Sequence, residues 1–453
     1  MGPTDGPAVN ARDHAPPVES TLHEDPVELC QHLVRFDTTN PPGGERRCVE
    51  WIGRLLDAYG VEWETYAGDP ERPNLIARIP GGAGEPLLAY GHVDVVPTTE
   101  QDWTHDPFGG QLADGYVWGR GTLDMKGGVA MYLAAFLGLA AAEEAPPGDR
   151  LLAILVDEEA GGDDGAAHLV ETQPAALEGV RYAIGEFGGF STTVRGERFY
   201  PVQVAEKQVC WLEVTFQGDA GHGSLPSDDD AMARMARFVS ALDGERLPAH
   251  PHPVVEAMLE GIGQELAVHE RLVLASLQRP RLADRILPRL GEAGDMFDPL
   301  LRNTVNETVV RGGGKENVVP ERVTLTLDCR LLPGQGPADV IREIETLTGM
   351  DVTVSVERFD EAPPAPDMGG FDTLASVLET ADPAGTVVPF MLPGASDARH
   401  LSHLGIQTYG FTPMQLPASF DFMSVIHAAD ERIPTAALEW GTERVREALW
   451  RSL

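Results

Sequence analysis

The sequence predicts an α/β protein with a second, α+β unit inserted into it, and three observations support this fold class. Short apolar segments of strand type alternate with helical patterns in the first and last parts of the chain, which is typical of a sheet with helices on both faces. The middle of the chain instead has alternating strands with two helices. The length of 453 residues exceeds one ordinary domain.

The first part of the outer unit is expected to span residues 25–205 and to begin with two helices. Their patterns, PVELCQHLVRFDT and RRCVEWIGRLLDAYG, are separated by the breaker NPPGG, and Gly60 closes the second helix as a C-cap. An Ala-rich helix, VAMYLAAFLGLAAAEE, follows among segments expected to be strands: NLIARI, LLAYGHVDVV, LLAILVD and YAIGEF. In a sheet of this kind the functional groups lie where the strands end.

The inserted unit is expected over 206–359. Strand patterns such as VCWLEVTF and RVTLTLDCRLL alternate there with two helices, and residues 250–300 form an additional helical elaboration. The outer unit resumes over 360–453. Residues 1–24 are rich in Pro, Gly and charge, and we expect them to be a disordered leader.

The composition excludes several classes of function. Acidic residues outnumber basic ones by 71 to 34, and a net charge of -37 opposes binding to nucleic acids and anionic membranes. The chain has no apolar stretch of membrane-spanning length and no signal-type run near its start. The four cysteines form no C-x-x-C pair, so we expect reduced thiols. A cytoplasmic protein is the expectation.

The segment LLAYGHVDVV ends with a histidine and an aspartate. In a strand successive side chains alternate between faces, so His92 and Asp94 would point the same way. The pair alone fits two interpretations, a buried histidine satisfied by a carboxylate or a functional pair.

Two further segments place carboxylates after apolar strands. In LLAILVDEEAGG a strand delivers Asp157, Glu158 and Glu159 at its end, and Glu186 in YAIGEFGG repeats the arrangement. Adjacent buried carboxylates repel one another unless a cation neutralises them. A solvated loop is the alternative for the three acidic residues.

Asp124 and His427 complete the set. Asp124 stands between glycines in WGRGTLDMKGG, where a turn aspartate or a phosphate loop is the alternative. A phosphate loop would need Gly at this position or a G-K-S/T ending, so we reject it. His427 lies in DFMSVIHAADERI, just ahead of a helix.

Taken together, the five sites favour divalent metal. Oxygen and imidazole ligands without thiolate suit zinc, cobalt or manganese. More than four ligands suggest two ions that share a bridging carboxylate.

These residues resemble the co-catalytic zinc aminoacylase and carboxypeptidase family. That family includes aminoacylase, carnosine-type dipeptidases, carboxypeptidase S, succinyl-diaminopimelate desuccinylase and acetylornithine deacetylase. The resemblance covers roughly residues 25–450, and DEEAGG, YGFTP and the helical elaboration are most similar to the carboxypeptidase S branch. It rests on the order and spacing of His92-x-Asp94, the G-R-G-x-x-D-M-K-G motif around Asp124, Glu158-Glu159, Glu186 and His427.

The resemblance implies a zinc-exopeptidase-like catalytic domain with an inserted ferredoxin-like lid and dimerisation domain. It implies two divalent metal ions per chain, with zinc expected and cobalt or manganese as alternatives. Asp124 would bridge them, and the two ligand sets would be His92, Asp124 and Glu186 for one ion and Asp124, Glu159 and His427 for the other.

Two more roles in the outer unit follow from the resemblance. Asp94 would hydrogen-bond the other nitrogen of His92 and so fix its tautomer. Glu158 would accept a proton from the attacking water and pass it to the leaving amine.

The resemblance also assigns roles in the inserted unit and in the loop PGASDARHL. His222 in QGDAGHGSLP falls where the family places a histidine that reaches into the partner subunit's active site to stabilise the oxyanion, although a polar turn histidine is the alternative. The expected substrate-binding residues are Asn317, Arg330, Gly394 and Ser396, with Arg399 as a further candidate.

The expected function is hydrolysis of an amide bond in an N-acyl amino acid or small peptide with a free carboxylate, by a homodimer. A desuccinylase or deacetylase of amino-acid biosynthesis is the alternative within this class. Two alternatives lie outside this class. A dinuclear phosphoesterase is disfavoured by the acidic composition and by the lack of a phosphate loop in the sequence. A non-catalytic metal-binding protein is disfavoured by the presence of Glu158.

Overall fold

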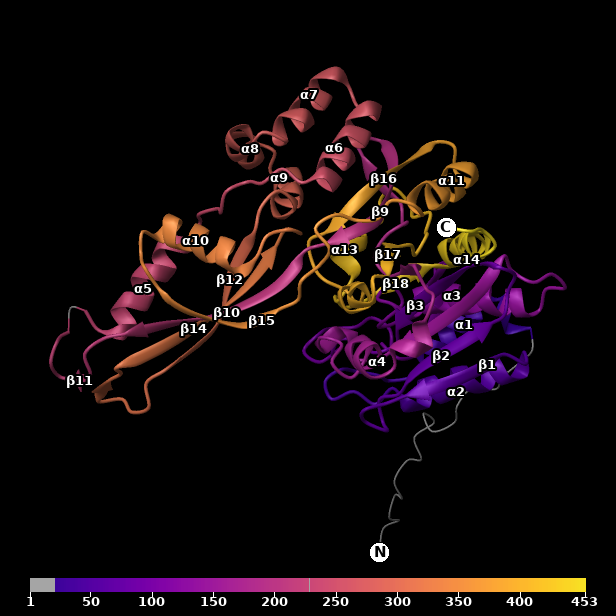
Figure 1. Ribbon diagram of the computed structural model, residues 1–453, viewed down its shortest axis with the longest axis horizontal. Helices are drawn as coiled ribbons and strands as arrows, with labels where there is room; N and C mark the ends of the chain where they lie inside the picture. Colours follow the sequence, from indigo (N-terminus) through magenta and orange to yellow (C-terminus); the bar gives the residue numbers. More distant parts are fainter. Residues whose placement is uncertain (1–20, 228) are drawn as a thin grey trace, which may run out of the picture. The chain divides into compact units, whose positions relative to one another are not determined.

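The computed structural model describes residues 21–227 and 229–453, and the chain divides into two compact units (Figure 1). The first unit is built from three stretches, which are residues up to Thr193, Gly369–Gly385 and His403–Leu453. The second comprises Val194–Met368 and Thr386–Ser402.

The domain limits expected from the sequence, 25–205, 206–359 and 360–453, stay a prediction. The two units differ from them at 194–205, 360–368 and 386–402, which all belong to the second unit. In the last of these stretches strand β16 (Gly385–Leu392) is the neighbour of β9 (Glu197–Glu206). The expected leader lies outside the described residues except at 21–24, where Leu22–Glu24 form a short 3-10 helix and Leu22 is buried.

A largely parallel sheet forms the centre of the first unit. Its strands follow the order β1-β2-β6-β3-β7-β17, in which β3 is parallel to β6 and β7, and β17 is parallel to β7. The strands on one side, β1 and β2, are antiparallel. The bounds are β1 Glu62–Tyr66, β2 Asn74–Ile79, β3 Gly84–His92, β6 Gly148–Leu155, β7 Tyr182–Gly185 and β17 Gln407–Gly410.

Helices cover this sheet and confirm the α/β prediction. The Ala-rich helix α3 packs against β3 and β6 and contacts α1 and α14, and it is buried on nearly every side because few of its residues are polar. The helices are α1 Pro26–Val34, α2 Arg46–Ala58, α3 Lys126–Ala140, α4 Ala166–Thr172, α11 Phe371–Ala381, α13 Phe422–Val425 and α14 Thr435–Leu449. A small sheet joins β4 Gln111–Ala113, β5 Tyr116–Trp118 and β18 Arg432–Pro434.

Strand β3 begins three residues before the predicted segment LLAYGHVDVV and ends at His92, four residues before that segment ends. Beyond this point the chain pairs with the segment after α1. The N–H of Val95 donates to the carbonyl of Thr38 at 3.1 Å, and the N–H of Asn40 donates to the carbonyl of Val95 at 2.9 Å. Asp94 therefore lies between the sheet and this segment rather than inside a strand.

The second unit contains a four-stranded antiparallel sheet with the order β12-β14-β10-β15. Helices α5 and α10 contact this sheet, and its buried core includes Phe238 from α5 and Ile344 from α10. The order β10-α5-β12-β14-α10-β15 along the chain is that of a ferredoxin-like unit. The bounds are β10 Gln208–Gln217, α5 Ala231–Leu242, β12 Thr304–Gly312, β14 Arg322–Leu331, α10 Pro337–Thr348 and β15 Thr353–Phe359.

The expected elaboration between α5 and β12 is helical. It consists of α6 Pro253–Glu265, α7 Val268–Leu277, α8 Pro280–Ile286 and α9 Glu292–Phe297. The remaining short elements are β8 Thr192–Val194, β11 Gly221–His222, β13 Val318–Val319 and α12 Ala398–Leu401. In the part of the chain that the structure describes, no helix combines the length and apolar character needed to cross a lipid bilayer.

The four cysteines should be unreactive while the protein is folded. Cys30, Cys48, Cys210 and Cys329 are all free and buried. Burial raises the pKa of Cys30 and of Cys48 to about 12, which suppresses the nucleophilic thiolate. We expect Ellman's reagent to detect almost no thiol in the native protein and all four in denaturant. Rapid labelling of a native cysteine would contradict this.

Candidate metal centre

Five carboxylate and imidazole side chains come together in the first unit, where the parallel strands of its sheet end. His92 is the last residue of β3, Glu186 directly follows β7, and Glu159 lies in the 3-10 turn after β6. Because β6, β3 and β7 are parallel neighbours, their carboxyl ends lie side by side. Asp124 comes from the loop before α3, and His427 from the loop after α13.

Asp124 lies between the two histidines. Its Oδ1 is 3.1 Å from Nε2 of His92, and its Oδ2 is 2.9 Å from Nε2 of His427. The same nitrogens also face glutamates, with Glu186 3.4 Å from His92 and Glu159 3.4 Å from His427. In each of these two groups of three residues, the ligand atoms lie within 4.8 Å of one another. The geometry therefore offers two adjacent cation sites that share Asp124.

A buried glutamate oxygen fits this interpretation. Among the described residues, Oε1 of Glu186 is buried and has no hydrogen-bond partner, whereas Oε1 of Glu159 lies 3.4 Å from Nε2 of His427. Leaving a buried carboxylate oxygen without a partner is costly, and a bound cation removes this cost. Carboxylate and imidazole donors suit zinc, cobalt or manganese.

Hydrogen bonds to neighbouring carboxylates raise the pKa of both histidines. Burial lowers the pKa of His92, but its hydrogen bonds to Asp124, Asp94 and Glu186 raise it well above the usual value. Hydrogen bonds to Asp124 and Glu159 raise the pKa of His427 to about 10. A metal ion that binds Nε2 of either ring must compete with these protons.

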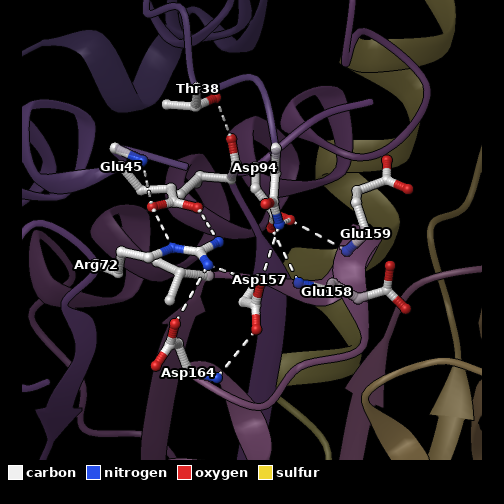
Figure 2. Close-up of polar contacts among 12 residues, drawn as sticks. Thr38, Glu45, Arg72, Asp94, Asp157, Glu158, Glu159 and Asp164 are labelled. Carbon is white, nitrogen blue, oxygen red and sulfur yellow. Dashed lines mark hydrogen bonds and ion pairs between the residues drawn. The ribbon is translucent and has the colours of Figure 1, made fainter. Parts of the chain in front are cut away.

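Asp94 is fully buried and holds one histidine and two glutamates. Its Oδ1 is 3.4 Å from Nδ1 of His92, while Nε2 of that ring faces Asp124. The N–H groups of Glu158 and Glu159 donate to the two oxygens of Asp94 at 3.2 and 3.1 Å (Figure 2). Burial raises the pKa of Asp94, but its hydrogen bonds lower it below the usual value, so the group is ionised near neutral pH.

Glu158 and Glu159 follow a residue in the left-handed region, Asp157, whose φ is 66°. Figure 2 shows both glutamate side chains extending away from Arg72, whereas the carboxylate of Asp157 points toward it. The three adjacent carboxylates therefore separate. Asp157 pairs with Nη1 of Arg72 at 2.8 Å, and Glu158 remains half-buried beside Glu159.

A buried ion pair joins the loops that carry Asp124 and His427. Nη1 of Arg120 donates to Glu431 at 2.7 Å, and Nη2 of Arg120 donates to the carbonyl of His427 at 3.2 Å. Glu431 in turn accepts hydrogen bonds from the N–H groups of Leu123 and Asp124 at 2.8 and 3.2 Å. This ion pair was not predicted from the sequence. The one feature of the sequence that could have indicated it is that each partner lies four residues from a predicted metal ligand.

His222 and Asn317 lie close together in the second unit. His222 is in β11, which pairs with β13 directly after Asn317, and the N–H of Gly223 donates to the carbonyl of Asn317 at 2.9 Å. The imidazole of His222 is exposed, and its Nδ1 is 2.8 Å from the hydroxyl of Ser224. The role of His222 at the oxyanion stays a prediction.

The other substrate-binding candidates are also in the second unit. Nε and Nη2 of Arg330 donate to Asp328 at 2.8 and 3.0 Å. The hydroxyl and N–H of buried Ser396 donate to Glu206 at 2.7 and 3.0 Å. At Gly394 an added Cβ would meet only Leu392, at 3.9 Å, so packing does not require glycine there. The substrate-binding roles of these residues and of Asn317 stay predictions.

The α/β fold and the two groups of possible metal ligands are typical of metal-dependent hydrolases, and the comparisons with known proteins agree with this class. The model of Peptidase family M20/M25/M40 matches residues 88–451, so the chain belongs to this family. The family is metal-dependent, and the chain is a metal-dependent amidohydrolase.

Several curated relatives are similar over most of the chain. A probable carboxypeptidase S-like 2 from Dictyostelium discoideum is 29% identical over 77% of this chain and 68% of its own length. An N-fatty-acyl-amino acid synthase/hydrolase PM20D1 from Xenopus tropicalis is 29% identical over 78% and 70%. A succinyl-diaminopimelate desuccinylase from Cereibacter sphaeroides is 28% identical over 92% and 95%.

Solved structures share the fold. An M20 family metallo-carboxypeptidase from Sulfolobus solfataricus has a TM-score of 0.64 at 18% identity, covering 94% of this chain and 98% of its own. Human carnosine dipeptidase 1 has a TM-score of 0.61 at 16% identity, covering 94% and 96%. These likenesses confirm the predicted fold class, and the match to the family model confirms the predicted family.

Proposed function

We propose that this protein is a dinuclear metal-dependent hydrolase of amide bonds in N-acyl amino acids or small peptides that carry a free carboxylate. The observation that carries the proposal is the position of Asp124, whose two oxygens face Nε2 of His92 and Nε2 of His427. A carboxylate placed in this way can bridge two ions, with Glu186 and Glu159 completing the two sites.

The chain's own residues have distinct tasks in the proposed reaction. Bound divalent ions supply Lewis-acid polarisation of the amide carbonyl and make the attacking water more acidic. Glu158 accepts the proton of that water and delivers it to the leaving amine, so that the C–N bond breaks to give a carboxylate and an amine. Asp94 orients Glu158 through its backbone N–H and His92 through Nδ1.

We propose zinc as the metal, with cobalt or manganese as functional substitutes, because the donor set contains only carboxylates and imidazoles. We also propose a cytoplasmic location, which the four free, buried thiols support.

We further propose a homodimer formed through the second unit. Strand β12 is at the edge of its sheet, where unpaired backbone groups favour addition of another strand, and Val309 and Val310 on it are exposed. In this dimer His222 would stabilise the oxyanion in the partner's site. The measurements are the molar mass in solution and the kcat of His222→Asn, which should fall with little change in metal content.

The test of the proposed function is a substrate panel with the zinc-loaded and cobalt-loaded protein. It contains N-acetyl and long-chain N-acyl amino acids, dipeptides, N-succinyl-diaminopimelate, N-acetylornithine and phosphate monoesters. Turnover of acyl amino acids or dipeptides, absent in Glu158→Gln, is the expected result. Turnover of phosphate monoesters alone would overturn the proposal.

A desuccinylase or deacetylase is the second candidate. It is favoured by the match to succinyl-diaminopimelate desuccinylase, which spans 92% of this chain and 95% of the relative, a larger share than the acyl-amino-acid hydrolases reach. Preference for N-succinyl-diaminopimelate or N-acetylornithine over all other members of the panel would select this alternative.

Zinc affinity should fall as the pH is lowered. Hydrogen bonds to Asp124 and Glu159 raise the pKa of His427 to about 10, so this imidazole holds a proton below that pH. Burial and the charge of Asp124 raise the pKa of Glu159 to about 7, so a second proton competes below neutrality. Competition with a chromophoric chelator should therefore give a steeper loss of affinity below pH 7 than above it. Equal affinity at pH 6 and 8 would contradict this expectation.

A further inference from the structure

A buried arginine lies behind the two glutamates, outside the metal centre. Arg72 stands just before β2, and its side chain is 10% exposed. Its Nε and Nη2 donate to the two oxygens of Glu45 at 3.2 and 2.8 Å, and its Nη1 lies 2.8 Å from Asp157 and 3.3 Å from Asp164. One guanidinium thus contacts three carboxylates, two of which are buried, and offsets part of their negative charge.

A continuous set of hydrogen bonds leads from this arginine to the glutamates (Figure 2). The side-chain amide of Asn40 has two N–H groups, and its nitrogen lies 3.0 Å from Oδ1 of Asp157 and 2.9 Å from Oδ2 of Asp94. The two oxygens of Asp94 then accept the N–H groups of Glu158 and Glu159. Figure 2 marks no hydrogen bond or ion pair between Arg72 and the side chain of Glu158 or Glu159.

Asp157 also fixes the turn from which the glutamates project. Its φ of 66° is unusual for a residue other than glycine, so the surrounding contacts must hold it. Its Oδ2 accepts the N–H of Asp164 at 3.0 Å, which closes the loop, while its Oδ1 binds Arg72 and Asn40. Without the guanidinium, Asp157 would lie buried beside Asp94 and Glu45 with no cation to offset their repulsion.

We propose that Arg72 is a positioning residue for the hydrolysis: through Asp157, Asn40 and Asp94 it fixes the backbone that presents Glu158 and Glu159. This inference rests on the proposed function for the roles of those glutamates. It assigns to Arg72 no contact with substrate or metal. Its effect is expected on kcat and on the geometry of the bound metal, with little effect on KM.

The test compares Arg72→Lys with Arg150→Lys. Lysine keeps the charge but lacks the planar fork, so it cannot bind Glu45 through two nitrogens and reach Asp157 as well. Arg150 is a matched control because it is also a buried arginine of the first unit, at the start of β6, where its guanidinium donates to backbone carbonyls. The readouts are melting temperature, kcat, KM and the visible spectrum of the cobalt-loaded protein.

We expect Arg72→Lys to lower kcat about 10–100-fold, the range typical for loss of an outer partner of a metal site, with KM within about twofold. The cobalt spectrum should shift, because Glu159 is in one of the ligand groups. Arg150→Lys should lower the melting temperature but leave kcat and the spectrum unchanged. If both variants change only the melting temperature, Arg72 is merely structural and the proposal is overturned.

A second variant, Asn40→Ala, tests the series of hydrogen bonds that leads from Arg72 to the glutamates. It also covers the case in which Arg72→Lys does not fold. It removes the bridge between Asp157 and Asp94 while leaving the contacts of Arg72 in place. The same fall in kcat and the same spectral shift are expected. A normal kcat and a normal cobalt spectrum in Asn40→Ala would overturn the proposal that Arg72 acts on the glutamates through Asn40. If the wild type hydrolyses nothing on the panel, the proposed function fails, and the cobalt spectra still decide whether Arg72 and Asn40 position Glu159.

Discussion

Glu158→Gln should abolish most turnover while the protein keeps its metal. Glutamine has nearly the same shape but cannot accept the proton of the attacking water, and general acid–base catalysis is typically worth about 10²–10⁴-fold. The backbone N–H of Glu158 would still donate to Asp94, so the turn should stay in place. We expect kcat to fall by a factor in this range, with two zinc ions per chain retained by mass spectrometry of metals.

The neighbouring residue supplies the control. Glu159→Gln changes the same functional group one position along the chain, but Glu159 belongs to the group formed with Asp124 and His427. This variant should lose zinc as well as activity. If Glu158→Gln loses zinc, or if it keeps more than about a tenth of the wild-type kcat, the assignment of Glu158 to proton transfer is wrong.

Asp124→Asn should empty both metal sites. The carboxylate faces His92 with one oxygen and His427 with the other, so its charge serves both groups. An amide offers one oxygen and a nitrogen that cannot bind a cation. We expect the zinc content to fall well below one per chain, with a loss of activity beyond the 10–100-fold that an outer partner typically costs.

His427→Asn separates this effect from general damage to the site. His427 takes part in only one of the two groups, so this variant should keep about one zinc ion, bound by His92, Asp124 and Glu186. Equal zinc contents in Asp124→Asn and His427→Asn would show that Asp124 is not shared. Circular dichroism of both variants checks that the fold is intact.

Much of the candidate metal centre could be predicted, because several of its residues lie at or after the ends of strands that the hydrophobic pattern of the sequence reveals. His92 is the last residue of β3, Glu186 directly follows β7, and Glu159 lies in the turn after β6, and parallel strands bring their ends to one edge. The ferredoxin-like unit was predictable from two of its strands, because β14 and most of β10 alternate buried with more exposed residues. Asp124 and His427 lie in loops, and it was the resemblance to a family that gave them partners.

The supporting network could not be predicted from local pattern. Asn40 stands in the breaker NPPGG, and Arg72 precedes a proline, so each has the appearance of an ordinary loop residue. Asn40 meets Asp157 across 117 residues of chain, and hydrophobic periodicity carries no information about such polar pairs. From the sequence, the three adjacent carboxylates at 157–159 were treated as one group at the end of a strand. In the structure, the left-handed turn at Asp157 directs the first of them to Arg72.

The ion pair between Arg120 and Glu431 bears on how the enzyme matures in the cell. Its partners are 311 residues apart, and the second unit is translated between them. A nascent chain on the ribosome can therefore offer His92, Asp124 and Glu186 long before His427 exists. The group formed by Asp124, Glu159 and His427 is therefore completed only when the last segment of the polypeptide has been made. Under the proposed function, binding of a second ion would be a late event of biosynthesis.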